Sequence, residues 1–399
     1  MAQTMATLNH VAKEVYRGTL NKQLNDDVVA LRRIERSSDI ETDQLGGKYV
    51  VFAIHTRRNS GIGARNEMEA LPTPGQQGYS SGRLTLKYQY AGVLLSGQAI
   101  SLINTKPQSF INAVETEMSR LRKDLGVYLN RQVYGDGSGT LATISATGSG
   151  NTLTVSDPSL LNIGDNIDIL TSAGASVATG RTITGIAGNV ITFNGATQAT
   201  AAGQILTITG NYNREWTGFG AIVKDTGTLY NIDPTVEPIW KAVVAANGGT
   251  PRAISEGLLN QTTDQVKING GKSTVGFTTY GVRRAYANLL QQQRQYVNTN
   301  GKFDGGYTTL AYSTPDGDIP LVVDRMAPKG KIWFMNEDEL TLYRDNDWDF
   351  MTYGDSDKWR MLQQGGNDFD AYISRLYQYS ELGTERRNTH AVVADIQEQ

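Results

Sequence analysis

The sequence predicts an α+β fold that carries a small all-β module as an insertion. Three observations support this prediction. A long amphipathic helix is expected at residues 107–134, and residues 45–100 before it have the pattern of two strands joined by a long loop. Residues 140–211 then change character, because charge almost vanishes and short β-branched runs alternate with glycines. With 399 residues, the chain is long enough for two or three domains.

The helix expected at residues 107–134 has one apolar stripe. Thr105 with Gln108 is expected to cap its start, and Gly135 to adopt the left-handed conformation that ends a helix. At about 1.5 Å per residue it would be roughly 40 Å long, which suits a strut. Apolar residues recur along it at steps of three or four, the spacing of one helix face: Phe110, Val114, Met118, Leu121, Leu125 and Tyr128.

Residues 45–100 are expected to form an extended hairpin with a glycine- and proline-rich tip. Residues 48–55 are rich in β-branched and aromatic residues, and residues 83–90 alternate. Because an isolated two-stranded ribbon is marginal in water, the hairpin needs a surface to lie on. Its six basic and two acidic residues between positions 48 and 87 favour an acidic surface. The alternation would place four side chains on one face of the second strand: Leu84, Leu86, Tyr88 and Tyr90.

The composition of residues 140–211 predicts a small β-barrel or sandwich. Short runs such as NTLTV, NIDIL, RTITGI, NVITF and QILTI are separated by glycine turns. Only four residues between positions 140 and 210 are charged, and they are Asp157, Asp165, Asp168 and Arg181. A disordered low-complexity segment is the alternative, but the β-branched residues cluster in runs as they do in strands.

Residues 212–399 combine helices and strands. Helices are expected from Thr250-Pro251 to Val266, stopped by Asn269-Gly270, and at residues 282–295. Strands are expected at 273–279, 319–323 and 331–335, and Asn336 with Glu339 should cap a short helix. The chain then ends in a long β-rich run bent at Gly383. This run has few local partners, so we expect it to pair with distant strands.

The composition excludes several classes of protein. The net charge of −3 gives no global basic excess of the kind that indicates nucleic-acid binding. No apolar run is long enough to span a bilayer, and the first 20 residues lack the apolar centre of a signal peptide. With no cysteine, disulfides and thiolate metal sites are excluded.

Two motifs resemble ligand-binding loops but are incomplete. Gly270-Gly271-Lys272-Ser273 looks like the end of a phosphate-binding loop, but Val266 stands where the motif needs its first glycine, so a helix stop is the better interpretation. Asp345, Asp347 and Asp349 have the spacing of calcium ligands, but Phe350 and Ser356 replace the required Gly and Glu.

No other pattern indicates catalysis. The three histidines are far apart in sequence, and Ser138 does not have the spacing of a nucleophile elbow. The aromatic residues of the last third fit a core or an interface better than a stacking surface for sugars or bases. We therefore expect no catalytic residue, no cofactor and no metal.

The order of elements resembles the major capsid protein of tailed bacteriophages, which has the Hong Kong phage-type capsid fold. An arm, a long hairpin and a long helix are followed, after the insertion, by a mixed α/β region and a β-rich tail. The sequence from Leu129-Asn130-Arg131 to Gly139 looks like the exit of that family's spine helix. Residues 218–240, 319–340 and 385–393 are similar to later stretches of the family. The resemblance covers most of the chain outside 140–210.

The resemblance implies a division of the chain into five regions. Residues 1–44 would be the N-terminal arm and 45–100 the extended loop (E-loop). Residues 101–139 and 316–399 would form the peripheral domain with the spine helix, 212–315 the axial domain, and 140–211 an inserted module.

The resemblance also implies a function and partners. Such proteins assemble as hexamers and pentamers into the icosahedral shell around phage double-stranded DNA. The expected partners are copies of the chain itself, a portal protein, a separate scaffolding protein, a cement protein and, non-specifically, the packaged DNA, with no membrane. We expect the protein in the virion, assembled in the host cytoplasm.

Basic residues of the arm and the hairpin are the predicted intersubunit contacts. Some relatives form covalent cross-links through a lysine of the extended loop, but residues 57–86 contain none here, which predicts non-covalent contacts. The expected contact residues are Arg17, Arg32, Arg33, Arg57, Arg58, Arg65, Arg83 and Lys87.

Two other functions remain open at this point. An encapsulin-like shell, which encloses cargo enzymes in bacteria, would share the fold. A glycan-binding β-module protein is the alternative from another class, although the missing signal peptide argues against it. An enzyme ranks third, because no constellation of residues could carry the chemistry.

Overall fold

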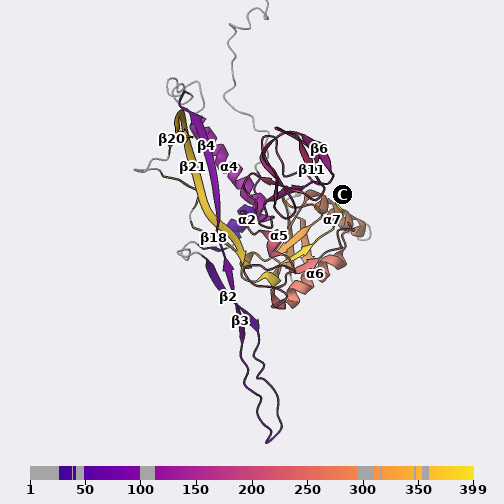
Figure 1. The fold of residues 1–399 in the computed structure, drawn as a ribbon. Coiled ribbons are helices and arrows are strands. Elements are labelled where there is room, and N and C mark those ends of the chain that lie inside the picture. The colour runs from indigo at the N-terminus through magenta and orange to yellow at the C-terminus, as the bar shows by residue number, and fades with distance from the viewer. Residues whose placement is uncertain are drawn as a thin grey trace, which may run out of the picture.

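The computed structural model describes residues 27–37, 39–41, 49–98, 113–294, 310–314, 317–345, 347–352 and 359–399. The described chain contains three six-stranded sheets and two strand pairs. Figure 1 shows a body from which one strand pair, β2 and β3, extends far outward, while β4, β20 and β21 extend in the opposite direction. No helix among the described residues is long and apolar enough to cross a membrane.

The predicted spine helix is present as α4, Ala113–Val133. Of the predicted apolar stripe, Leu125 is buried and Leu121 and Tyr128 are partly buried, whereas the buried Leu129 and Val133 were not part of that stripe. The expected cap and first turn, residues 105–112, lie outside the described residues. At about 1.5 Å per residue, the described helix is roughly 31 Å long.

The predicted end of the spine helix is wrong in its detail. Tyr134 N donates to the carbonyl of Arg131 and Gly135 N to that of Gln132, so the last turn tightens. Positive φ values occur at Gly137 (86°) and Gly139 (75°), and not at Gly135. The left-handed residues therefore belong to the turn after the helix and not to its cap.

One six-stranded sheet is organised around the 18-residue strand β21, Asn367–Thr384. This confirms that the C-terminal run pairs with distant strands: β4 runs antiparallel along it from Ser96 opposite Ala371 to Lys87 opposite Ser380. The other strands of this sheet are β1 (Asp39–Glu41), β18 (Leu340–Arg344), β19 (Asp349–Phe350) and β20 (Arg360–Gln364), and β4 spans Lys87–Ser96.

The single strand predicted at residues 83–90 is two strands, and in the second of them the tyrosines are exposed while a glutamine is buried. β3 (Gly78–Leu84) pairs with β2 (Val50–Arg57), and the chain then starts β4 at Lys87. Gln89 is buried, whereas Tyr88 and Tyr90 are 61% and 55% exposed. The reason is that Gln89 and Gln132 of α4 exchange two amide hydrogen bonds of 3.2 and 3.3 Å, so the polar face of β4 lies against the helix.

A second sheet forms the centre of the body, with the order β13-β22-β17-β14-β16-β15. On one face, α6 and α7 cover it through Leu259, Val266 and Tyr286. Trp333 and Phe277 belong to the other face, where they pack with the end of the spine helix. The strands are β13 (Val243–Ala245), β14 (Val275–Thr278), β15 (Leu310–Thr314), β16 (Gly317–Val323), β17 (Ile332–Met335) and β22 (Ala391–Val393).

The helices of the body lie close to their predicted positions, with two corrections. α6 (Glu256–Ile268) begins five residues after Pro251, because the Ser255 hydroxyl caps it by accepting from Leu258 N at 3.3 Å. It ends at Asn269, as expected. Asn336 precedes only a single 3₁₀ turn, and its side chain makes no capping bond. The remaining helical segments are α2 (Ala30–Ser37), α5 (Phe219–Ile222), α7 (Tyr280–Arg294) and the 3₁₀ turns Pro238–Trp240, Glu337–Glu339 and Arg387–Thr389.

Asp324, a buried carboxylate at the end of β16, connects three distant segments. Its Oδ2 accepts from Ala30 N of α2 (3.1 Å), from Asn130 Nδ2 of α4 (2.8 Å) and from the Tyr134 hydroxyl (3.2 Å). Its Oδ1 accepts from the backbone of Met326 at 2.8 Å. Asn130 also accepts from Leu31 N at 2.9 Å. Burial is the main cause, and the charge of the Asp324 carboxylate the second, that raises the pKa of Tyr134 well above its ordinary value. The Tyr134 hydroxyl therefore stays protonated and remains a donor.

The β-rich segment after the spine helix has its own apolar core. Its six-stranded sheet has the order β5-β12-β8-β9-β10-β7, and β6 pairs with β11 beside it. Ile144, Ile167, Ile191 and Leu206 are almost fully buried in this core. The strands are β5 (Thr140–Thr143), β6 (Gly148–Gly150), β7 (Thr152–Thr154), β8 (Asn166–Leu170), β9 (Ser176–Ala187), β10 (Val190–Phe193), β11 (Gln198–Thr200) and β12 (Ile205–Ile208).

The two ends of this β segment lie side by side, because Asn213 N donates to the carbonyl of Ser138 at 3.1 Å. Leu160 is the member of the segment that also packs against the core around the spine helix. The predicted domain boundaries stay predictions. One of them separates the predicted axial domain from the second part of the predicted peripheral domain at residue 315, and strands from before and after this residue share the central sheet.

We predict that deleting residues 140–210, so that Gly139 joins Asn211, leaves the rest of the protein folded. The deletion removes a complete apolar core and few contacts to the other two cores. Circular dichroism and urea unfolding should show one cooperative transition, and the spine-helix signal should persist. Loss of cooperative unfolding would contradict the interpretation of this segment as an insertion.

Candidate intersubunit surface

The base of the β2–β3 hairpin is anchored to the body by aromatic packing. Phe52 of β2 lies edge-on to Tyr230 and near Trp240, with ring centroids at 5.9 and 6.4 Å. Gly82 of β3 faces Phe52, and a Cβ at this position would lie 2.4 Å from the ring. Gly82 therefore lets the phenyl ring lie flat against the strand and reach its two aromatic partners.

Polar contacts extend this anchor along the hairpin. The backbone N of Arg83 donates to the carbonyl of Tyr230 at 2.9 Å. The Ser80 hydroxyl donates to Glu237 at 3.1 Å, and the Arg57 guanidinium lies 3.8 Å from the same carboxylate. The part of the hairpin nearest the body is thus fixed in direction by contacts to residues 230–240.

The tip of the hairpin is ordered by its own hydrogen bonds. Arg65 donates to the carbonyls of Ala64 and Ala70, both at 2.8 Å, and Asn66 N donates to the Glu69 carboxylate at 2.9 Å. Gly61 lies so close to the opposite strand that a Cβ would be 2.5 Å from Gly75 N. A projecting segment with internal order keeps one shape, and this lowers the entropy cost of binding.

Three large apolar side chains at the tip are almost completely exposed. Ile62 is 87% exposed, Met68 100% and Leu71 85%, all on the segment that Figure 1 shows farthest from the body. Apolar side chains gathered on an ordered projection indicate a binding surface. The pattern of charges in the sequence does not reveal them, because they are single apolar residues within a glycine- and proline-rich stretch.

The predicted basic contact residues fall into three groups. Arg57, Arg58, Arg65 and Arg83 are exposed on the hairpin, and Arg32 is exposed on α2. Arg33 makes an ion pair of 2.6 Å with Glu337, and the Lys87 ammonium donates to the carbonyl of Asn213 at 3.3 Å, so both have partners within the chain. Arg17 lies outside the described residues. Their role in contacts between subunits stays a prediction.

A cluster of four tyrosines lies on the sheet formed by β4 and β21. Tyr379 makes ring contacts with Tyr88 (5.0 Å), Tyr377 (5.2 Å) and Tyr90 (6.4 Å). These residues occupy the face opposite to Gln89, and therefore the face away from α4. The alternation of residues 83–90 identifies the two faces of this strand but not which one is buried.

A second buried carboxylate, Glu381 of β21, lies where the long sheet meets the body. Its Oε1 accepts from Thr217 N at 2.6 Å and from Leu382 N at 3.1 Å, while Oε2 has no partner among the described residues. Burial raises the pKa of Glu381 to about 8, against the lowering effects of the Thr217 bond and the Lys87 charge. The carboxyl group is therefore mainly protonated at neutral pH.

The described residues offer no group of three or more His, Asp or Glu side chains that could hold a metal ion. The features that stand out are an anchored hairpin, an exposed apolar tip and an aromatic sheet face. Such features suit contacts between proteins better than chemistry on a small substrate.

Solved structures with the same fold include capsid proteins. The chain matches the cyanophage A-1(L) capsid asymmetric unit with a TM-score of 0.63 and 14% identity over 99% of both chains. It matches a Microbacterium phage Oxtober96 structure with a TM-score of 0.52 and 10% identity over 98% of both chains. The capsid of an empty GTA particle matches with a TM-score of 0.52 and 9% identity over 100% of both chains. The fold is thus that of phage capsid proteins.

The match to a sequence family identifies the protein more specifically than the match of the fold. A family described as SU10 major capsid protein matches residues 173–397, more than half of the chain. This protein belongs to the SU10 major capsid protein family, and its place is the shell of the virion. The family match favours neither the encapsulin-like nor the glycan-binding alternative. No curated protein sequence matches the chain.

Gly82→Ala is expected to weaken the anchor of the hairpin. The new methyl group must displace the Phe52 ring from Tyr230 and Trp240, which we expect to cost about 1–3 kcal/mol of the free energy of unfolding. Urea unfolding measures this. The matched control is Gly92→Ala in β4, where the nearest atom to the new Cβ is 3.6 Å away and the change should stay within about 0.5 kcal/mol. If the two substitutions change the free energy of unfolding equally, the packing of the Phe52 ring does not depend on the missing side chain at Gly82.

Glu381→Gln is expected to make the protein less sensitive to alkaline pH. Because the folded-state pKa is raised, the neutral carboxyl contributes stability that is complete below pH 4.5 and is lost as pH rises through about 8. Between pH 6.5 and 8.5, the wild type should lose on the order of 2 kcal/mol of stability through this group, and the glutamine variant should not.

The measurement is the urea midpoint across that pH range. His390 does not interfere, because burial lowers its pKa to about 3 and its effect is confined to lower pH. Glu67→Gln, the same change at the exposed tip, is the control and should keep the wild-type slope. If Glu381→Gln also keeps that slope, the buried carboxyl does not titrate as described.

Proposed function

We propose that the chain assembles with copies of itself, as hexamers and pentamers, into the icosahedral shell that encloses phage double-stranded DNA. The observation that carries this proposal is the anchored hairpin with its exposed apolar tip. Ile62, Met68 and Leu71 have nothing to pack against within the described part of the chain, and their exposure stabilises nothing in a monomer. Burial against a neighbouring subunit would remove this apolar surface from water.

In this proposal, each region has its own role. Residues 45–100 act as the extended loop that lies on an adjacent subunit, and residues 1–44 as an arm. The spine helix and the β21 sheet form the peripheral domain, and 212–315 most of the axial domain. The exposed arginines Arg57, Arg58 and Arg83 would meet acidic groups of the neighbour, which sets the register of the contact more than its strength.

The proposal extends to other partners. A portal protein and a separate scaffolding protein would complete the assembly in the host cytoplasm, and a cement protein could strengthen a shell that lacks the cross-linking lysine. The inner face would meet packaged DNA through charge alone, without sequence specificity. The role is structural and not enzymatic, since the features described above serve packing and assembly.

We predict that replacing Ile62, Met68 and Leu71 together by serine abolishes closed shells but leaves the subunit folded. All three side chains are exposed, so the free energy of unfolding should change by less than about 1 kcal/mol. Negative-stain microscopy and size-exclusion chromatography, after co-expression with the other assembly proteins of the phage, measure shell formation.

The control variant also replaces exposed apolar side chains by serine, but at positions outside the hairpin. Ile163→Ser with Ile268→Ser removes two exposed apolar side chains, 67% and 75% exposed, that lie outside the hairpin. These substitutions should leave assembly intact. Normal shells from the tip variant would refute the role given to the hairpin, and equal failure of both variants would show that no single surface is responsible.

A further inference from the structure

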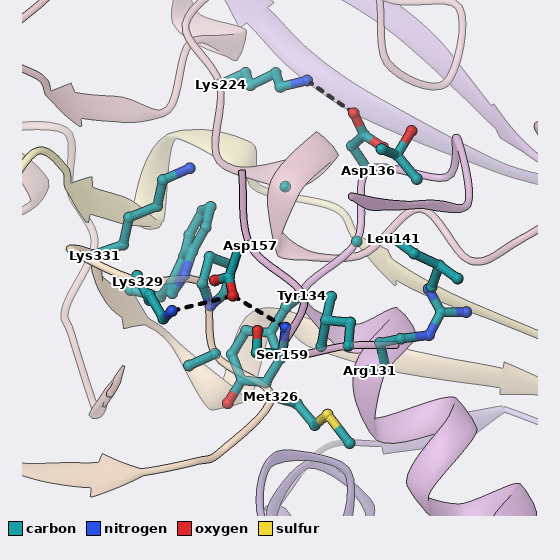
Figure 2. Close-up of a pocket in the computed structure, with 17 residues that line it drawn as sticks. Arg131, Tyr134, Asp136, Leu141, Asp157, Ser159, Lys224, Met326, Lys329 and Lys331 are labelled. Carbon is teal, nitrogen blue, oxygen red and sulfur yellow. Dashed lines mark hydrogen bonds and ion pairs between the residues drawn. The ribbon is translucent and has the colours of Figure 1, made fainter. Parts of the chain in front are cut away.

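A cavity of about 420 Å³ lies between the inserted β segment and the body. Figure 2 shows the residues that line it, with the end of the spine helix on one side and the loop before β17 on another. Leu141 and Met326 contribute apolar walls, and Thr140 and Ser159 polar ones. A cavity of this size accommodates a small molecule or a hydrated anion.

Three lysines from two segments line the cavity. Lys224 follows α5, Lys329 lies in the loop before β17, and Lys331 immediately precedes β17. Lys329 makes an ion pair with Asp157 at 3.1 Å, and Lys224 approaches Asp136 only to 3.8 Å. Both of those lysines are about half exposed, so their ammonium groups are free to turn toward a ligand.

Lys331 has no carboxylate within ion-pair distance among the described residues. Figure 2 shows it beside the two ion pairs, with no contact drawn to it. Burial lowers the pKa of Lys331. The Asp395 carboxylate opposes this, the Lys224 charge lowers the pKa further, and the Asp136 carboxylate raises it. An anion placed between Lys331 and Lys224 would offset the cost of burying the Lys331 ammonium and the repulsion between the two ammonium groups.

An unsatisfied buried donor lines the same cavity. Trp333 is 3% exposed, and its indole Nε1–H has no hydrogen-bond partner among the described residues. The Lys331 ammonium lies 5.5 Å from the centre of this indole ring, so the two groups are neighbours. Buried tryptophan N–H groups usually have a partner, and an unpaired donor is costly. The indole N–H and the Lys331 ammonium are both hydrogen-bond donors, so an acceptor in the cavity could serve both.

We propose that this cavity is a binding site for a phosphate group, held by Lys331, Lys224 and the indole N–H of Trp333. A tetrahedral anion has enough oxygens to accept from donors on several walls at once, whereas a carboxylate has two. Because residues of both the β segment and the body line the cavity, a bound phosphate would strengthen the contact between them. The proposal does not depend on how the subunits assemble.

Calorimetric titration of the full chain with inorganic phosphate tests the proposal, with sodium chloride at equal ionic strength as reference. Wild type should bind, and Lys331→Met should bind about tenfold more weakly or worse, the effect of losing one charge-assisted hydrogen bond. Trp333→Phe keeps the ring and loses the donor, and should weaken binding roughly threefold. This second variant keeps the test decisive if Lys331→Met fails to fold.

Lys272→Met is the matched control. Lys272 is exposed and pairs with Asp338 outside the cavity, so this variant should bind phosphate like the wild type. Thermal unfolding with and without phosphate is a second measurement. Phosphate also stabilises proteins by exclusion from their surface, so the quantity to compare is the difference in stabilisation between the variants and the wild type. No binding by wild type, or equal binding by Lys331→Met and wild type, would overturn the proposal.

A further titration distinguishes the sources of the phosphate group. A dinucleotide presents a phosphodiester, and glycerol phosphate presents a monoester. Stronger binding of the dinucleotide than of orthophosphate would identify a nucleic-acid backbone as the ligand. Binding of orthophosphate and glycerol phosphate alone would identify a free or monoester phosphate. In both cases Lys331→Met should remove the binding.

Discussion

The Asp324 carboxylate is the constraint on which the body of this protein depends. It accepts hydrogen bonds from α2, from the spine helix, from Tyr134 and from its own turn, and it is 1% exposed. A buried charge is tolerated only when its acceptor sites are filled, so these segments must meet at one point. The first described helix, the spine helix and the central sheet are thereby held in a single arrangement, and the hairpin and the β21 sheet extend from it.

Periodicity made the long elements predictable. The stripe through Leu121, Leu125 and Tyr128 identified the spine helix. The β-branched and aromatic residues of 48–55 and the alternation of 83–90 identified the hairpin. Periodicity could not assign the buried face of β4, because Gln89 and Gln132 satisfy each other and leave the tyrosines outside. Local signals also misplaced caps: Gly135 and Asn336 are good cap residues, but the neighbouring chain decides which turn forms.

The candidate surfaces were less predictable than the fold. Charge in the sequence pointed to the arginines of the hairpin, whereas the structure adds the exposed Ile62, Met68 and Leu71 and the tyrosine cluster of the β21 sheet. The lysine-lined cavity depends on Lys224 from one segment and on Lys329 and Lys331 from another, about a hundred residues later. Such a site has no motif, because its spacing is set by the packing of the β segment on the body and not by the order of residues.

The pairing of β21 with β4 determines how late in translation the long sheet can form. About 270 residues separate the two strands, and β22, which lies between β13 and β17 in the central sheet, follows β21 in the chain. At roughly 5–20 residues per second, a ribosome needs on the order of 15 to 55 seconds to deliver β21 after β4. A nascent chain therefore lacks the long sheet until β21 has emerged, and the complete central sheet until β22 has emerged. A chain that stops before β21 contains the β2–β3 hairpin but can complete neither of these sheets, so its hairpin extends from an unfinished body.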